Sequence, residues 1–285
     1  MSGVGVGYRL VRAKLAILTG LERAASGARR LGLGAAVDRL APLVGRPFER
    51  FVLDVDGVRL AGTELAHLHY VRELREQGRE RTFVRLLAEA VPPGGTVLEG
   101  GAHLGFVTVH AARAAGRTGR VVVFEPNRDV LGVLGENLAA NGVAGRVEVH
   151  ALALGERPHR SRFHASGETS SLFEAVPGAE CVEVEVVRGD DAVEGPVDVI
   201  KLDVEGGELD ALRGMERLVA GARALFLELN PELLERAGAS REELLAWVAE
   251  RGFEAEWIDE SRGRTASLHE PWTEDYVNLV CRRTA

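Results

Sequence analysis

Residues 96–106 read TVLEGGAHLGF, an apolar stretch that ends in a glycine-rich loop and passes at once into a helical pattern. Glycines let the backbone approach a ligand closely, and the first turn of the following helix presents free N–H groups. Residues 120–125, RVVVFE, form a second apolar stretch one helix length later. Strands that are apolar throughout are typical of a parallel sheet covered by helices on both faces. This segment therefore predicts the start of a doubly wound α/β domain with a nucleotide-type site.

The alternation of strand and helix patterns continues to the C-terminus. The predicted strands are residues 96–100, 120–125, 146–152, 197–204, 223–230, 253–258 and 276–281, and the predicted helices are residues 104–115, 127–141, 206–218 and 241–251. Residues 155–192 interrupt this order. Within them Val182, Val184 and Val186 alternate with glutamates, which predicts an amphipathic strand.

Residues 1–91 are predicted to form an N-terminal extension of the domain at residues 92–285. Apolar residues at helical spacing predict a helix at residues 8–18, far short of the roughly 20 residues that span a membrane. Residues 51–61 predict a hairpin around Asp56-Gly57. Residues 70–90 predict a charged helix that ends at the prolines and glycines of residues 92–95. We expect this helical and hairpin extension to act as a lid or as a contact between subunits of a homo-oligomer.

Composition and charge narrow the function classes. The 285 residues carry a net charge of −8, are 46% hydrophobic and include only two cysteines, Cys181 and Cys281. Cysteines so far apart form neither a zinc ribbon nor a disulfide scaffold, so we expect a cytoplasmic protein. Because the apolar run at residues 8–18 is short, we expect no integral membrane segment. Residues 1–50 carry a net charge of +6, which leaves −14 for the rest. A body this acidic, with no basic stripe, disfavours nucleic acid as the substrate.

Glu125 ends the second strand, 24 positions after Gly101. An acidic residue at this spacing can accept hydrogen bonds from both hydroxyls of a ribose, in NAD or in any other adenosine ligand. Ala102 occupies the position of the second glycine in the dinucleotide fingerprint, which weighs against NAD. Alternatively, Glu125 could favour the dipole of the next helix, with Asn127 as its N-cap.

Residues 197–208, VDVIKLDVEGGE, carry charges into an apolar strand. Strand alternation puts Lys201 and Asp203 on one face, and Glu205 follows where the strand becomes a helix. Only two of the 35 basic residues are lysines, and Lys201 is one of them. Because ionised groups in such a strand must be paired, the segment predicts either a functional cluster or a purely structural ion pair.

Four segments resemble the FkbM family of S-adenosylmethionine-dependent methyltransferases. Residues 97–106 are similar to that family's D-x-G-A-N-x-G-x-x-T loop, with Glu99 and His103 replacing the usual Asp and Asn. Residues 200–208, together with Leu212-Arg213-Gly214, resemble its K-x-D-x-E-G-x-E…L-x-G signature, which is the more specific part. Residues 225–228 resemble its fifth strand and Ser170-Ser171-Leu172 its serine motif, so the resemblance covers about residues 51–230.

The resemblance implies a class I methyltransferase fold, a seven-stranded, mostly parallel sheet whose last strand inserts antiparallel. It implies S-adenosylmethionine as the cofactor, with the residue 99–106 loop around its methionine part. Glu125 would hold the ribose, Pro126 and Asn127 would flank the adenine, and residues 150–152 would close its other side. The implied cofactor residues are Glu99, Gly101, Ala102, His103, Gly105, Phe106, Glu125, Pro126, Asn127, Ala151 and Asp203.

For the chemistry we expect O-methylation of a hydroxyl on a small-molecule or sugar-bearing metabolite. A hydroxyl nucleophile must lose its proton as it attacks, so a general base is needed. Asp203 is the first candidate, oriented by Lys201, with Glu205 and His103 as second choices; Asp203 could instead anchor the cofactor's amino group. N-methylation, an NAD-dependent oxidoreductase and a noncatalytic cofactor-binding module are the alternatives.

The expected acceptor pocket lies between the N-terminal segment and the insertion that carries Ser170 and Ser171. No metal is predicted. Asp203, Glu228 and Asn230 end adjacent strands and carry oxygen atoms that suit Mg²⁺, but nothing in their spacing requires an ion. His67 and His69 lack a third ligand, which indicates surface or lid histidines.

Overall fold

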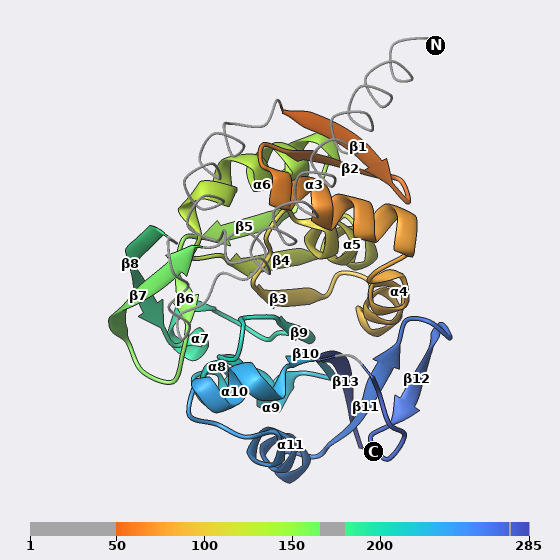
Figure 1. Cartoon of the computed structure of the whole chain (residues 1–285). Helices are drawn as coiled ribbons and strands as arrows, with labels where there is room; N and C mark the ends of the chain where they lie inside the picture. The colour runs from red at the N-terminus through yellow and green to blue at the C-terminus, as the bar shows by residue number, and fades with distance from the viewer. Residues whose placement is uncertain (1–49, 166–179, 274, 285) are drawn as a thin grey trace, which may run out of the picture.

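The central sheet of the computed structural model has eight strands in the order β12-β11-β13-β10-β9-β3-β4-β5 (Figure 1). The structure describes residues 50–165, 180–273 and 275–284. The strands of the central sheet are β3 (Thr96–Gly100), β4 (Arg120–Phe124), β5 (Val147–His150), β9 (Val199–Leu202), β10 (Ala224–Leu229), β11 (Phe253–Asp259), β12 (Arg264–Ser267) and β13 (Val277–Arg283).

All seven predicted strands lie in this sheet, and the doubly wound α/β fold is confirmed. β3, β4, β5, β9 and β10 pair in parallel, and β13 inserts antiparallel between β10 and β11, as predicted. The predicted count of seven misses β12, which adds an eighth strand at the edge. Only Ala266 of its four residues is buried, so the sequence offers no apolar stretch there.

Two hydrophobic cores cover the two faces of the sheet. On one face Val121 and Val123 pack with α5 (Phe106–Ala115) and α6 (Arg128–Ala140). On the other face, Val122 and Phe124 belong to the core built by α8 (Glu208–Arg213), α9 (Glu216–Gly221), α10 (Pro231–Arg236) and α11 (Arg241–Glu250). Alternate residues of an apolar strand therefore fill opposite cores. The predicted helix at residues 206–218 is divided, since α8 ends at Arg213 and α9 begins at Glu216.

The described part of the N-terminal extension shares the first of these cores. β1 (Phe51–Val55) and β2 (Val58–Gly62) form the predicted hairpin, with positive φ at both Asp56 and Gly57. The predicted helix at residues 70–90 is broken into α3 (Leu65–Arg72), the π-helix η1 (Glu73–Gln77) and α4 (Arg81–Ala90). Gly78 and Glu80 interrupt it with positive φ. Residues from Phe51 to Val91 thus share a hydrophobic core with the predicted domain at residues 92–285. The predicted helix at residues 8–18 lies outside the described residues, and the role as a lid or a subunit contact stays a prediction.

The insertion after β5 forms a second sheet beside the main one (Figure 1). Its strands are β6 (Ala153–Leu154), β7 (His159–Ala165) and β8 (Glu180–Val187), followed by the short helix α7 (Gly189–Ala192); η2 (Ala144–Arg146) is a single 3₁₀ turn before β5. β8 confirms the amphipathic strand predicted around Val184. Ser170 and Ser171 lie outside the described residues. Among the described residues, no helix is long and apolar enough to cross a membrane.

The strand order reverses between β3 and β9, which is where ligands bind in an open α/β sheet. Gly100 pairs with Leu202 across these strands, so the loops that follow them run side by side. Gly101 has φ +75, and a Cβ added there would meet the carbonyl oxygen of Asp203 at 1.9 Å. Only glycine fits at this crossing, and the crossing brings the glycine loop against Asp203.

Candidate active site

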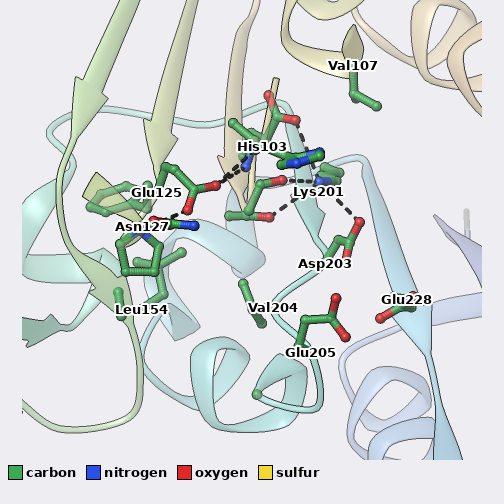
Figure 2. Close-up of a pocket in the computed structure, with 18 of the residues that line it drawn as sticks. His103, Val107, Glu125, Asn127, Leu154, Lys201, Asp203, Val204, Glu205 and Glu228 are labelled. Carbon is green, nitrogen blue, oxygen red and sulfur yellow. Dashed lines mark hydrogen bonds and ion pairs between the residues drawn. The ribbon is translucent and has the colours of Figure 1, made fainter. Parts of the chain in front are cut away.

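A cleft opens at the carboxyl ends of β3, β4 and β9, with about 1140 Å³ of space outside the atoms, including the part open to solvent (Figure 2). The predicted residues that line it are Glu99, Gly101, Ala102, His103, Glu125, Pro126, Asn127, Lys201, Asp203 and Glu205.

Three predicted cofactor residues do not line the cleft. Gly105 is the N-cap of α5, and the Phe106 side chain points into the core, where its ring meets that of His110 edge-on. Ala153 and Leu154 line the cleft where Ala151 was predicted to do so, because the chain continues from β5 to β6 before it reaches the cleft. The sequence located the correct turns but not the residue of each turn that faces inward.

The Glu125 carboxylate holds the glycine loop in place. Its Oε2 accepts hydrogen bonds from the backbone N–H groups of Ala102 (3.0 Å) and His103 (2.9 Å), and its Oε1 accepts one from Asn127 (2.9 Å). Asn127 in turn caps α6, because its Oδ1 accepts from the Asp129 N–H at 3.1 Å. Oε1 accepts a single bond from the described residues and keeps capacity for a hydroxyl of the ligand. Glu125 therefore has a structural role as well, and its contact with a ribose stays a prediction.

Lys201 lies buried at the centre of the charged cluster. Its Nζ donates to the carbonyl of Gly101 and lies 3.6 Å from carboxylate oxygens of both Glu99 and Asp203. Burial lowers the pKa of Lys201, but the carboxylates of Asp203, Glu99, Glu80 and Glu125 outweigh that effect and leave it raised. The ammonium therefore stays charged. The predicted pairing of Lys201 with Asp203 is confirmed, and one amine joins β9 to the glycine loop.

His103 is a poor candidate for the general base. Burial, together with the nearby charges of His67, Lys201 and Arg79, lowers the pKa of His103 to about 3. Its ring packs edge-on against those of Tyr70 (4.9 Å between centroids) and His67 (5.3 Å). The imidazole is thus neutral and weakly basic, and it joins the glycine loop to α3.

The N-terminal extension supplies a wall of the cleft that the sequence analysis missed. Tyr70, Arg79 and Glu80 line it, and the Tyr70 hydroxyl donates to Oε2 of Glu80 at 3.2 Å. Arg79 lies 3.7 Å from Glu80, and its guanidinium group covers the rings of Tyr70 and Tyr276. The helix predicted across residues 70–90 hid this arrangement, because the break at Gly78 and Glu80 turns these side chains inward.

The burial of Glu80 in this wall should make the free energy of unfolding depend on pH. Burial raises the pKa of Glu80 to about 7, against the opposing effects of Arg79 and Lys201. Since the folded pKa exceeds that of the unfolded chain, the folded protein binds this proton more tightly and loses stability as the pH rises through about 5 to 8. We expect Glu80→Gln to be more stable than the native protein at about pH 8 by up to about 3 kcal/mol, with the gap vanishing near pH 4. Urea unfolding at several pH values measures it.

The matched control for this experiment is Glu89→Gln, which changes an exposed glutamate of α4, the helix that begins directly after Glu80. It should alter the free energy of unfolding little, because the exposed ion pair between Glu89 and Arg85 contributes little to stability. A Glu80→Gln effect that does not vary with pH would show that Glu80 is ionised at no cost in the folded protein.

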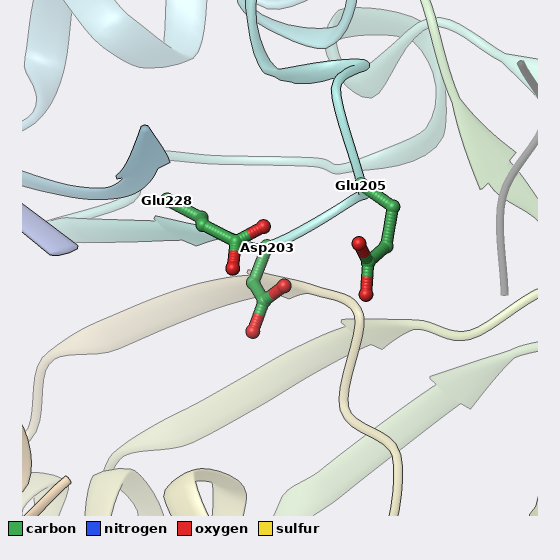
Figure 3. A group of neighbouring side chains, drawn as sticks. All are labelled: Asp203, Glu205 and Glu228. Atoms are coloured by element: carbon green, nitrogen blue, oxygen red, sulfur yellow. The ribbon is translucent and has the colours of Figure 1, made fainter. Parts of the chain in front are cut away.

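Three carboxylates converge on the side of the cleft away from Glu125 (Figures 2 and 3). Asp203, Glu205 and Glu228 each offer an oxygen, and these oxygens lie within 4.8 Å of one another. Asn230, the third oxygen ligand considered from the sequence, caps α10 instead, since its Oδ1 accepts from the Leu233 N–H at 3.3 Å. The oxygen donors that the fold brings together are therefore three carboxylates.

A model of the Methyltransferase FkbM domain matches residues 99–255, more than half of the chain. The chain belongs to the FkbM methyltransferase family. The match contains both the glycine loop and the segment from Lys201 to Glu208, so the predicted resemblance is confirmed. It also shows that the NAD-dependent oxidoreductase considered above is wrong and that this FkbM protein is a methyltransferase.

Known proteins similar to this FkbM methyltransferase include the hexuronic acid methyltransferase AglP of Haloferax volcanii. The two are 26% identical over 199 residues, which cover 68% of this chain and 80% of AglP. Among solved structures, the O-methyltransferase TomG of Streptomyces achromogenes has 15% identity and a TM-score of 0.44, covering 78% of this chain and 91% of TomG. An rRNA methylase of Streptococcus thermophilus has 14% identity and a TM-score of 0.44, covering 71% and 95%.

The methyl donor of the FkbM methyltransferase is S-adenosylmethionine, as predicted. When bound, this cofactor supplies an electrophilic methyl group on a positively charged sulfur. The cleft fits such a cation, since it is lined by six carboxylates and only two basic side chains, Lys201 and Arg79. Phe124, Leu154 and Phe163 add apolar surface beside Pro126 and Asn127, where a flat base can pack. The side chains therefore suit a ligand with an aromatic end and a cationic end.

Proposed function

We propose that this FkbM methyltransferase methylates a hydroxyl oxygen of a small-molecule or sugar-bearing acceptor. The observation that carries the proposal is the position of Asp203. Its side chain is 42% exposed in a cleft whose other charged groups are mostly buried, and Lys201 holds it at 3.6 Å. A carboxylate that is both fixed and accessible is suited to take a proton from an acceptor.

Methyl transfer is an in-line displacement, in which the acceptor's oxygen bonds to the methyl carbon while the carbon–sulfur bond breaks. The protein contributes mainly by aligning the two within about 3–3.5 Å. The hydroxyl proton passes to the Asp203 carboxylate, so the oxygen attacks without gaining a positive charge. The ammonium of Lys201 fixes Asp203 and lowers the electrostatic cost of negative charge on the oxygen. Glu205, two residues further on, is the second proton acceptor in reach of the same side of the cleft.

An acceptor rich in hydroxyl groups suits the remaining side chains. Glu80, Glu205 and Glu228 line the cleft and can accept hydrogen bonds from hydroxyls, while Arg79 can donate to oxygen. AglP, to which the chain is similar, is named for a hexuronic acid, a hydroxyl-bearing sugar. The wall formed by Tyr70, Arg79 and Glu80 precedes the residues matched by the family model.

The experiment incubates the full chain with S-adenosylmethionine carrying a ¹³C methyl group and a panel of neutral sugars, hexuronic acids and amino sugars. We expect the label to appear as an O-methyl resonance on a hydroxyl-bearing acceptor, in step with formation of S-adenosylhomocysteine. Label found on nitrogen of the amino sugars would replace the proposal with N-methylation. Product formation without any labelled sugar would exclude this acceptor class.

A further inference from the structure

Glu228 is buried at the acidic side of the cleft without a hydrogen-bond partner for its inner oxygen. Its side chain lies in β10 and is 8% exposed, and no described residue donates a hydrogen bond to its Oε2. Buried carboxylates are nearly always hydrogen-bonded or paired with a cation. The nearby ammonium of Lys201 is already held by Glu99, Asp203 and the carbonyl of Gly101. An unsatisfied carboxylate in this position needs a partner that the described side chains do not supply.

The Glu228 carboxylate faces two further carboxylates. Figure 3 shows Asp203 and Glu205 directed towards the same space, and one oxygen of each of the three lies within 4.8 Å of the others. Glu205 reaches this position through a left-handed backbone with φ 55, an unusual conformation for a residue with a side chain. Carboxylates held this close repel one another unless a cation or a proton lies between them.

We propose that Asp203, Glu205 and Glu228 form a binding site for a divalent cation that prefers oxygen ligands, such as Mg²⁺ or Mn²⁺. Ligands on opposite sides of an ion are about 4.2 Å apart for Mg²⁺ and about 4.6–5.2 Å apart for Ca²⁺, so three oxygens within 4.8 Å fit around one ion with small side-chain adjustments. Mg²⁺ usually takes few carboxylates and keeps open positions for water or substrate. The partial exposure of Asp203 and Glu205 leaves such positions towards the cleft.

Glu208 positions the loop that carries two of the ligands but is not itself a ligand. Its Oε1 accepts the Val204 N–H at 2.9 Å, which fixes the loop between Asp203 and Glu205. Its side chain is buried and its oxygen is not among those that converge. In the Lys-x-Asp-x-Glu-Gly-x-Glu segment, Asp203 and Glu205 are thus the cation ligands. Lys201 orients Asp203, and Glu208 fixes the loop between the two ligands.

The role of the cation rests on the proposed function. Bound beside Asp203, it would meet the oxygen of a hydroxyl-bearing acceptor and lower the pKa of that hydroxyl, which reduces the demand on the general base. The sequence-based expectation of a metal-free enzyme would then be wrong. The binding itself can be tested without any acceptor, so a failure to bind the cation and a failure to methylate oxygen are separate results.

The experiment treats the full-length protein with EDTA, removes the chelator and titrates it with Mn²⁺, following free Mn²⁺ by electron paramagnetic resonance. We expect one ion per chain. Glu228→Gln and Glu205→Gln should each weaken Mn²⁺ binding at least about tenfold, since each removes a charged ligand. Glu235→Gln, an exposed glutamate of α10, is the matched control and should bind like the native chain.

The cation site would be overturned if Mn²⁺ did not bind, or if it bound equally to the native chain and to both ligand variants. A proton shared among the three carboxylates would then explain how they lie so close together. S-adenosylmethionine affinity, measured by calorimetry with and without Mn²⁺, shows whether the cofactor site is intact in each variant. If Mn²⁺ binds but the EDTA-treated enzyme methylates its acceptor as fast as the Mn²⁺-loaded one, the site exists without the proposed role in acceptor activation. If the Mn²⁺-loaded enzyme methylates none of the hydroxyl-bearing acceptors, the cation site stands and the proposed acceptor class is wrong.

Discussion

Asn in place of Asp203 should reduce the turnover of the FkbM methyltransferase by about 10²–10⁴-fold, the usual contribution of a general base. Asparagine has nearly the same shape but cannot accept the hydroxyl proton. S-adenosylmethionine affinity should change by less than about threefold, because the glycine loop and Glu125 hold their geometry through contacts that do not involve the Asp203 side chain. Single-turnover kinetics and calorimetric titration measure the two effects separately.

Comparison of the two measurements distinguishes the roles that Asp203 can have. Equal losses of turnover and cofactor affinity would make Asp203 an anchor for the cofactor's amino group rather than the base. A Mn²⁺ titration of the same variant tests the proposed ligand role of Asp203, which predicts weaker Mn²⁺ binding. Glu235→Gln is again the matched control, and its turnover should equal that of the native chain.

The sequence predicts the sheet and the charged strand well, for an identifiable physical reason. Val121, Val122 and Val123 are buried on both faces, so their apolar pattern leaves no other interpretation. In the charged strand, a period of two places Lys201 and Asp203 on one face whatever surrounds them, and the structure has them 3.6 Å apart. Features that depend on local periodicity in a buried strand are therefore predictable from the chain alone.

Features that depend on backbone breaks and on long-range packing are not predictable in this way. Tyr70 and Glu80 line the cleft only because positive φ angles at Gly78 and Glu80 interrupt a pattern that otherwise indicates one helix. The sequence places Asp203 and Glu228 at the ends of adjacent strands, but not the third member of the cluster: Glu205, rather than Asn230, joins them in the register that sets Leu227 of β10 beside Leu202 of β9. Neither signal exists in any single segment of the sequence. The residues that we propose to contact the acceptor are thus those that sequence patterns are least able to reveal.

Replacement of Lys201 by Met should have the largest effect on stability. The side chains have similar length, but the change removes the ammonium that lies between Asp203 and Glu99, which is 1% exposed. It also removes the donor to the carbonyl of Gly101. Breaking a buried pair leaves an uncompensated charge, at a cost of about 3–5 kcal/mol. We expect a loss of that size in urea unfolding at about pH 7. Since burial already raises the pKa of Glu99 and Lys201 opposes that effect, the loss should grow as the pH rises.

A double variant tests the cause of this loss. Glu99→Gln removes the buried negative charge, so Lys201→Met combined with Glu99→Gln should recover at least about 1 kcal/mol relative to Lys201→Met alone. Lys201→Arg should not rescue the fold, because a planar guanidinium is too large for a site bounded by the Gly101 carbonyl and two carboxylates. Additive effects of the two substitutions would show that Lys201 does not act through Glu99. Coupling between them would show that Lys201 stabilises the fold through the Glu99 carboxylate, beside the point where the glycine loop crosses Asp203.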